Sequence, residues 1–373
     1  MDRIPYTEMF EVVKNEWIRD SATEGSTIES KYKSHINYAY ATLLPLSVDE
    51  EHLRKEAFVT TKADYSTGTI TITVAGTSVA GASTAWTSAN SNGFLFKATG
   101  KNLVMRVSYS AATSLTFDNS LAWTEDAIAT ESYRIILDRF ILPTDFNHML
   151  MDNRQFPQVV YFWLNNGKSF LKPRTPSEYD KEFSFSYGIP NIYTVKKDFA
   201  SNRLYLYIHP GDTDSRIVYY AYNPILTYMS EYTTGTVTLA ASTAVTGAST
   251  DFDGNIDTTN YDWYFRADAD GTGSNSVWYK VASVSGDTGL TLSIAYAGSN
   301  TGASKAYTIS GVSKYPPSLD RAIMLMGTAL AEPDPNQKRL NLEMFVNHIQ
   351  GFTTRDAKKI YGQILNVDLS GRG

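Results

Sequence analysis

Two pairs of aspartates have the spacing that comes nearest to a metal site. Asp251 and Asp253 lie in the sequence DFDG, and Asp268 and Asp270 lie in DADG. Calcium binds clustered oxygens on a tight turn, so each pair resembles a fragment of a calcium loop. Neither pair continues with acidic or amide residues at further alternate positions that end in a glutamate. Asp and Gly also favour turns, so turn formation is the preferred interpretation and calcium is the alternative.

The other residues that could do chemistry are scattered along the chain. The five histidines have no second histidine or carboxylate at the spacing of a known metal motif: His35, His52, His148, His209 and His348. The sequence contains no cysteine, and none of the motifs GxSxG, HExxH, GxGxxG or the P-loop. The separation of a carboxylate pair for glycoside hydrolysis is a three-dimensional property that sequence does not give. We therefore expect no enzymatic activity and no cofactor.

Tyrosines alternate along two predicted strands, at Tyr205, Tyr207, Tyr219, Tyr220 and Tyr222. A strip of aromatic rings could stack on sugars or on bases. Tyrosine also combines apolar area with a polar tip, which suits a half-buried sheet face or a subunit interface. We predict core or interface, and these five residues are the candidates for contacts between subunits.

The C-terminal segment, residues 352–373, is too apolar for an unattached terminus. Its basic residues exceed its acidic ones by two, although the whole chain has a net charge of −6. A terminus of this kind either folds back on its own core or docks on a partner, and we favour docking. The residues expected to dock are Ile360, Tyr361, Ile364, Leu365, Val367 and Leu369.

The composition of the 373 residues excludes several classes of protein. Without cysteine there is no disulfide framework and no thiolate zinc site. The longest apolar run, residues 322–331, is too short to span a bilayer, and the N-terminus lacks the apolar stretch of a signal peptide. An acidic chain without a Lys/Arg run is a poor candidate for binding phosphate backbones by charge. We expect a soluble protein of a reducing compartment or of a virion.

The sequence contains an internal repeat. GTITITVAGTSVAGASTAW, from Gly68, resembles GTVTLAASTAVTGASTDF, from Gly235, and the later segments SLTF (114–117) and YRI (133–135) resemble GLTL (289–292) and YTI (307–309). β-Branched residues alternate with small polar ones in both copies, which is typical of short antiparallel strands. We predict two copies of one small all-β module, residues 67–135 and 232–310.

Helical patterns lie near both ends of the chain. Capping boxes at 26–29 and 47–50 predict two N-terminal helices, the second running towards the first module. Asp334 followed by Pro335 predicts the start of a C-terminal helix, with Gly351 as its C-terminal cap. Between the modules, residues 159–164 and 169–172 predict one hairpin, and residues 203–209 and 216–222 another.

These elements together predict an α+β fold. The N-terminal helices (1–66) and the C-terminal helices (311–351) are expected to form a helical bundle. They would share one core with a middle antiparallel β-region (136–231). The two modules would be insertions at the surface of this core, because closing a longer loop costs little free energy.

The scaffold outside the modules resembles the head-to-tail adaptor proteins (neck or connector proteins) of short-tailed bacteriophages. The resemblance covers the whole chain as a succession of loose motifs: LPTDF at 142–146, TPSEYD at 175–180, GIPNIYTV at 188–195, RLYLYIHP at 203–210 and VYYAY at 218–222. The two β-modules depart from the minimal family pattern.

The resemblance implies a structural protein of the virion neck, assembled in the host cytoplasm. Family members form a ring of twelve copies beneath the portal protein, extend the DNA channel and dock the tail, nozzle or fibres. The C-terminal segment commonly reaches the portal. DNA would pass through the lumen without sequence-specific binding, and no membrane is involved. The alternative is a tail fibre or receptor-binding protein with carbohydrate-binding β-modules, and a secreted glycan enzyme is a third hypothesis.

Overall fold

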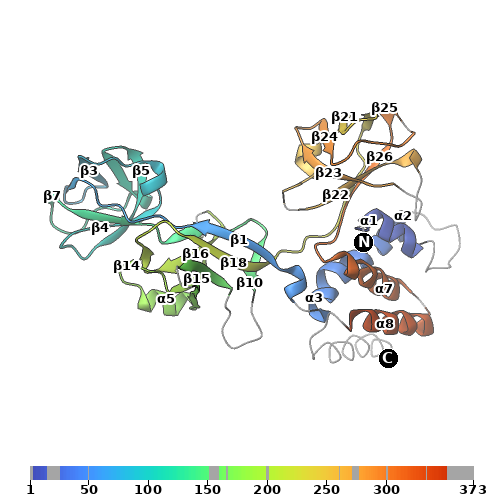
Figure 1. Cartoon of the computed structure of the whole chain (residues 1–373), viewed down its shortest axis with the longest axis horizontal. Coiled ribbons are helices and arrows are strands. Elements are labelled where there is room, and N and C mark those ends of the chain that lie inside the picture. The colour runs from blue at the N-terminus through green and yellow to red at the C-terminus, as the bar shows by residue number, and fades with distance from the viewer. Residues whose placement is uncertain are drawn as a thin grey trace. The chain divides into compact units, whose positions relative to one another are not determined.

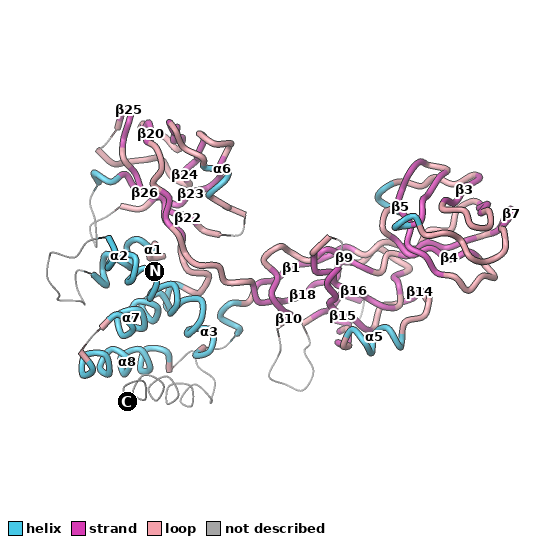
Figure 2. Tube along the Cα trace, turned by 180° about the vertical axis from the view of Figure 1, so that it is seen from behind, coloured by secondary structure: helices cyan, strands magenta, loops and turns pink. Residues whose placement is uncertain are grey.

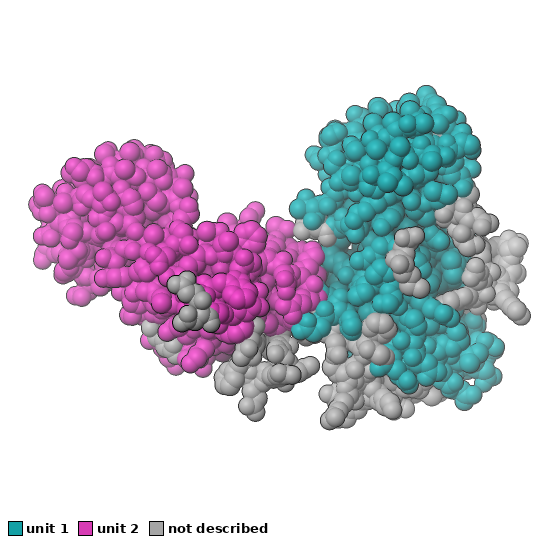
Figure 3. Space-filling view, viewed as in Figure 1, with its two compact units in different colours: residues 1–53, 225–373 teal, residues 54–224 magenta. Residues whose placement is uncertain are grey.

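The chain divides into two compact units. The computed structural model describes residues 3–14, 26–48, 50–150, 159–164, 167–198, 201–259, 261–270, 277–299, 301–332 and 334–350. Unit 1 comprises residues 1–53 and 225–373, and unit 2 comprises residues 54–224 (Figure 3). Module 1 (67–135) therefore lies in unit 2, together with the middle β-region. Module 2 (232–310) lies in unit 1, together with the terminal helices.

Strands dominate the secondary structure, with 39% of the structure in strands and 26% in helices (Figure 2). The predicted α+β class, in which a helical bundle and the middle β-region form one core, is therefore wrong. The helices bury their apolar residues in one cluster, and the middle strands bury theirs in another, in a different unit. The middle strands need no helical partner because two sheets cover each other's apolar faces.

Those two sheets share the core of the middle part of unit 2 (Figure 1). The first sheet has the order β1-β18-β11-β12, with β10 also paired to β18. Its strands are β1 (Lys55–Thr60), β10 (Phe146–Met149), β11 (Val160–Leu164), β12 (Gly167–Phe170) and β18 (Ile217–Pro224). The second sheet has the order β13-β15-β16-β9, and its strands are β9 (Arg139–Ile141), β13 (Lys172–Pro173), β15 (Ile192–Asp198) and β16 (Arg203–His209). Helix α5 (Pro176–Glu182) and the short pair β14 (Tyr187–Gly188) and β17 (Gly211–Asp212) complete this region.

One of the two predicted hairpins is confirmed and the other is wrong. Strands β11 and β12 pair antiparallel, with Leu164 opposite Gly167, as the first hairpin predicts. Strands β16 and β18 do not pair with each other, because β16 lies between β15 and β9 whereas β18 lies in the other sheet. Alternation of residues identifies a strand and its buried face, but it does not identify the neighbouring strand.

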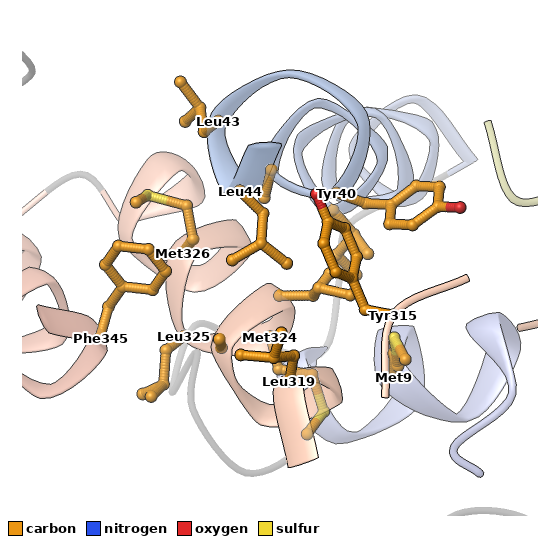
Figure 4. Packing of buried hydrophobic residues seen from close by; sticks show 14 of the residues in the cluster. Met9, Tyr40, Leu43, Leu44, Tyr315, Leu319, Met324, Leu325, Met326 and Phe345 are labelled. Atoms are coloured by element: carbon orange, nitrogen blue, oxygen red, sulfur yellow. The ribbon is translucent and has the colours of Figure 1, made fainter. Parts of the chain in front are cut away.

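The helical part of unit 1 is built around one almost wholly buried helix, α7 (Asp320–Ala331). Helices from both ends of the chain surround it, and Figure 4 shows Tyr40, Leu44, Leu325 and Phe345 among the side chains that meet there. A glycine permits the close packing of α2 on α7, because a Cβ at Gly327 would lie 2.9 Å from Ile36 Cγ1. The other helical elements are α1 (Tyr6–Val12), α2 (Ser26–Tyr38), a π-helical segment (Ala39–Leu43), α3 (Leu44–Ser47), two 3-10 turns (Glu50–Leu53 and Pro317–Leu319) and α8 (Pro335–Ile349).

The helix ends test the predicted caps. The Asp334 carboxylate accepts a hydrogen bond of 2.9 Å from the Asn336 amide, and Pro335 is the first residue of α8, so this start is confirmed. The second capping box is wrong, since the predicted helix is a single 3-10 turn, Glu50–Leu53, followed directly by β1. Gly351 lies outside the described residues.

The two modules have the same strand order. The sheet of module 1 runs β8-β4-β5-β6-β3-β2-β7, and that of module 2 runs β26-β22-β23-β24-β21-β20-β25, with β19 added beside β26. The strands of module 1 are β2 (Thr69–Ile72), β3 (Ser78–Ala82), β4 (Phe94–Ala98), β5 (Val104–Ala111), β6 (Ser114–Phe117), β7 (Ile128–Glu131) and β8 (Tyr133–Ile136). Those of module 2 are β19 (Glu231–Tyr232), β20 (Thr236–Leu239), β21 (Ala244–Ala248), β22 (Trp263–Ala267), β23 (Tyr279–Val284), β24 (Gly289–Leu292), β25 (Gly302–Lys305) and β26 (Tyr307–Gly311). Single helical turns follow equivalent strands in the two modules, α4 (Ser88–Ser91) after β3 and α6 (Phe252–Asn255) after β21.

Backbone geometry explains why both copies of the repeat have a glycine at the same position, Gly68 and Gly235. Gly68 and Gly235 have φ angles of 84° and 81°, a region that residues with a side chain rarely adopt. A Cβ at Gly68 would lie 2.5 Å from the carbonyl oxygen of Ala82, and Gly235 has the same contact with Ala248. The sequence Gly-Ala-Ser-Thr, at 81–84 in module 1 and 247–250 in module 2, therefore packs against the equivalent glycine in both modules.

Hydrogen bonds and ion pairs connect module 2 with helices α1 and α2. Arg266 of β22 is buried and donates two hydrogen bonds of 3.2 Å to the carboxylate of Glu11. The Glu231 carboxylate accepts hydrogen bonds from the Thr7 hydroxyl (3.0 Å) and from the Lys33 ammonium. Charge-assisted hydrogen bonds are about twice as strong as neutral ones. Because several of them join module 2 to the N-terminal helices, module 2 and these helices form one packed unit.

Candidate functional site

Three of the four aspartates considered for calcium accept hydrogen bonds within module 2. Asp251 caps α6 and accepts hydrogen bonds of 3.1 Å from the Gly254 amide and the Asn255 side chain. The Asp268 carboxylate accepts one of 2.8 Å from the Thr308 hydroxyl, and Asp270 accepts one from the Tyr296 hydroxyl. Asp253 is exposed within α6.

No group of three or more His, Cys, Asp or Glu side chains that could hold a metal is found among the residues that the structure describes. The five histidines lie on five different elements: α2, the 3-10 turn Glu50–Leu53, β10, β16 and α8. His209 is buried, precedes a cis proline and lies 3.2 Å from the Ser186 hydroxyl. His348 lies 2.8 Å from the Ser318 carbonyl oxygen, and burial lowers the pKa of His35. The Ser186 hydroxyl and the His209 ring are within hydrogen-bond distance, and the rings of Tyr179 and Phe183 pack against the imidazole. A hydrogen bond between a hydroxyl and a histidine does not by itself identify a catalytic site.

The tyrosine candidates divide between the two sheets of unit 2. Tyr205 is buried and Tyr207 is half-buried on β16, in the second sheet. Tyr220 and Tyr222 of β18 lie in the core between the sheets, and burial next to Asp145 raises the pKa of Tyr220 to about 12. Tyr219 is half-buried on the opposite side of β18, away from this core. The five residues therefore do not form one strip, because their two strands belong to different sheets.

Tyr219 lies at the centre of an aromatic row on the outer side of the first sheet. In the strand register Phe58 lies opposite Tyr219, Tyr219 opposite Tyr161, and Tyr161 opposite Phe170. The row therefore crosses four neighbouring strands, β1, β18, β11 and β12. Ring centroids are 6.2 Å apart for Phe58 and Tyr219, 5.4 Å for Tyr219 and Tyr161, and 5.7 Å for Tyr161 and Phe170.

A second row beside the first completes what we call the aromatic face. Trp163 and Ile217 lie two residues along from Tyr161 and Tyr219, so they share this side of the sheet. The aromatic face consists of Phe58, Tyr161, Trp163, Lys168, Phe170, Ile217 and Tyr219. Three of its aromatic residues are exposed, at 62% for Phe58, 58% for Trp163 and 38% for Phe170, whereas Tyr161 and Tyr219 are half-buried.

The alternation of the strands explains this arrangement. Val218, Tyr220 and Phe162 point into the core of unit 2 and are buried. An antiparallel sheet with one packed side commonly carries polar residues on the other side, which faces water. Here the outer side carries aromatic residues instead, and this makes it the candidate surface for contact with another molecule.

Lys168 is the cation of the aromatic face. Its ammonium nitrogen lies 4.2 Å from the ring centroid of Tyr161 and 5.2 Å from that of Trp163. Within the described ranges no carboxylate forms an ion pair with it. At the rim, Glu56 is already paired with Arg54 at 2.8 Å. An apolar centre with few charges at its edge is the composition of a protein–protein interface.

The orientation of the rings disfavours sugar stacking. Tyr161 and Tyr219 are nearly parallel, with 19° between their planes, and each covers a face of the other. Lys168 lies over the Tyr161 ring as well. A sugar needs a free ring face, so the centre of the row is better suited to contact with apolar side chains.

A polar cavity of ≈ 690 Å³ lies in unit 2, beside the loop that follows β6. Arg106, Asp118, Arg139 and Asp198 contribute its charged groups. The Arg106 guanidinium donates hydrogen bonds of 2.9 and 3.1 Å to the buried Asp138. The two arginines that line the cavity are balanced by the two lining aspartates, so the cavity shows no preference for an anion or a cation.

The sequence analysis missed most of the aromatic face. The alternation of Tyr161 and Trp163 in the predicted hairpin was an available signal. Phe58 could not be assigned to the same surface, because β1 pairs with β18 across more than 150 residues of sequence. The predicted docking residues of the C-terminal segment (360, 361, 364, 365, 367 and 369) lie outside the described residues.

None of the helices within the described ranges is long and apolar enough to cross a membrane. Comparison with protein-family models found no match to the chain. Comparisons with curated proteins and with solved structures found no significant similarity either.

Proposed function

We propose that the chain is a structural protein of a tailed bacteriophage, a head-to-tail adaptor that forms a ring beneath the portal. In this role it extends the DNA channel, docks the tail or nozzle proteins, and catalyses no reaction. Assembly takes place in the host cytoplasm, and the mature protein resides in the neck of the virion.

The aromatic face is the observation that carries this proposal. The row has two exposed rings, Phe58 and Phe170, on either side of the half-buried and stacked pair Tyr161 and Tyr219. A subunit of a permanent assembly would bury this apolar surface. Two similar β-modules on one chain also suit a scaffold with several contacts to other virion proteins.

The charge of the chain is compatible with a DNA channel. The net charge is −6, from 39 acidic and 33 basic residues. A weakly acidic lumen releases no counterions from DNA and makes few phosphate contacts, so DNA slides past it. A basic lumen would retain the DNA.

The test is to mix the purified protein with the portal protein encoded in the same genome and to image the mixture by electron microscopy. We expect the portal ring to gain a second tier with twelvefold symmetry. A bare portal beside free trimers of the protein would refute the proposal and would favour the fibre hypothesis.

A truncation tests the expected role of the C-terminal segment. Deletion of residues 360–373 should abolish the second tier while leaving the circular dichroism spectrum of the protein unchanged. Portal binding that persists at wild-type strength would assign docking to another part of the chain.

A further inference from the structure

We propose that a second copy of this chain covers the aromatic face, and that the outer side of helix α8 is the surface that it presents. The contact is heterologous, since one copy supplies the sheet and its neighbour supplies the helix. This inference rests on the proposed function, because a closed ring requires each subunit to present two different complementary surfaces.

The size of the aromatic face suits a protein partner. A whole aromatic side chain has an accessible area of about 200 Å². With their exposed fractions, Phe58, Trp163 and Phe170 together present roughly 300 Å² of exposed aromatic surface. Ile217, which is 44% exposed, extends this area. Specific interfaces bury about 800 Å² on each partner, so the aromatic face supplies the apolar centre of one side.

The rings are held in place before any partner binds. Each member of the row contacts the next, with centroid separations of 5.4 to 6.2 Å. Ordering flexible side chains at an interface costs free energy, and packed aromatic rings have little freedom left to lose. Binding of a partner to the aromatic face therefore costs little side-chain entropy.

Helix α8 carries a complementary surface in unit 1. Leu342, Phe345 and Ile349 are its buried residues. Leu340 and Met344 are 47% and 38% exposed on the other side of the helix, one turn apart. A helix with an apolar stripe buries that stripe against another element, and a flat sheet face is such an element.

Charge sets the register of this contact. Glu343 lies on the same side of α8 as Leu340 and Met344, and its side chain is 54% exposed. It forms an exposed ion pair of 3.8 Å with Arg339 of the same helix, and an exposed pair of this kind contributes little free energy, so Glu343 can exchange Arg339 for another cation. Lys168 lies beside the aromatic row and lacks a carboxylate partner within the described ranges. In the proposed contact, Glu343 of one copy pairs with Lys168 of its neighbour.

The first experiment measures self-association of the full chain by sedimentation velocity over a concentration series up to about 1 mM. We expect Phe58→Ser/Trp163→Ser to raise the dissociation constant for self-association at least 100-fold. Ile141→Ser serves as the control, because Ile141 is equally exposed (53%) but lies on the other sheet. An unchanged dissociation constant in the double variant, or a wild-type chain that stays monomeric throughout, overturns the inference.

A charge exchange tests the counterpart surface. Lys168→Glu and Glu343→Lys should each weaken self-association about tenfold or more, and the two changes in one chain should restore it. A mixture of the two single variants should associate again, because each variant repels its own copies whereas both contacts between unlike variants pair opposite charges. Lys62→Glu, an exposed lysine of unit 2, is the charge control. Failure of the combined variant to recover association would rule out α8 as the counterpart.

Imaging on the portal separates this inference from the proposed function. If Phe58→Ser/Trp163→Ser still forms a complete second tier, the adaptor role stands and the aromatic face is not the subunit contact. If the wild-type chain self-associates through this face but never joins a portal, the inference stands and the adaptor role fails. If the double variant self-associates normally but no longer binds tail proteins, the occupant is a tail protein and the inference is overturned.

Discussion

Asp320, the first residue of α7, should make the stability of unit 1 decrease as pH rises. Its side chain is fully buried, and burial raises the pKa of this carboxyl to about 6. Hydrogen bonds from the Ser313 hydroxyl (2.6 Å) and the Ile4 amide (3.2 Å), with the nearby Arg3 charge, offset only part of that effect.

The sign follows from the direction of this shift. The folded state binds a proton more tightly than the unfolded chain, in which the pKa of aspartate is about 3.9. Protonated Asp320 therefore adds to the free energy of unfolding in full below about pH 4, and this stabilisation declines as pH rises and is lost above about pH 6. The full shift corresponds to about 3 kcal/mol, of which about 2 kcal/mol falls between about pH 4.5 and about pH 7.5.

Hydrogen exchange measured by mass spectrometry gives a local readout for this prediction. The amides of residues 3–14 and 320–331 should lose about 2 kcal/mol of opening free energy between those two pH values, after correction for intrinsic exchange rates. Asp320→Asn should remove most of this dependence, because an amide does not titrate. Protection that increases with pH in the wild type, or an equal pH dependence in the variant, would refute the reasoning.

Three further predictions concern packing in unit 1 and module 2. Gly327→Ala should destabilise unit 1 by about 1–3 kcal/mol in thermal melts, because the new methyl group must displace Ile36. Gly235→Ala should cost more than about 1 kcal/mol, since it adds a left-handed φ penalty to a clash with the Ala248 carbonyl, and a wild-type melting curve would contradict this geometry. Arg266→Met should cost about 3–5 kcal/mol in chemical denaturation because it leaves the Glu11 carboxylate without its buried partner. Changing both Arg266 and Glu11 to Met should cost less than Arg266→Met alone, and a strictly additive double variant would argue against the ion pair.

The repeat and the local caps could be predicted from the sequence. Glycines that need a positive φ, and β-branched residues that alternate between them, recur in both modules because each module must satisfy the same geometry. Asp334 and Pro335 identify the start of α8 for a similarly local reason, since a cap depends on residues within one turn.

The fold class and the aromatic face depend on contacts that are distant in sequence. The pattern RLYLYIH predicts a strand correctly, but nothing in it indicates that β16 pairs with β15 and β9 instead of β18. The terminal helices form a core of their own, and no local pattern separates that arrangement from one shared with the middle strands. The sequence likewise does not show that Phe58 joins Tyr161 and Phe170 across β18.

The ends of each module lie side by side. Tyr65 pairs with Ile135 across the start and finish of module 1, and Tyr232 pairs with Ile309 at the same place in module 2. The host chain on either side is thus separated by the width of one strand pair, however long the intervening segment is. A domain with adjacent termini could therefore replace either module without changing the path of the flanking chain. The replacement must also compensate for ion pairs that the modules make outside themselves, among them Arg106 with Asp138 for module 1 and Arg266 with Glu11 for module 2. The chain thus has one insertion point in each unit, and at the one in unit 2 the Asp138 carboxylate needs a new cation.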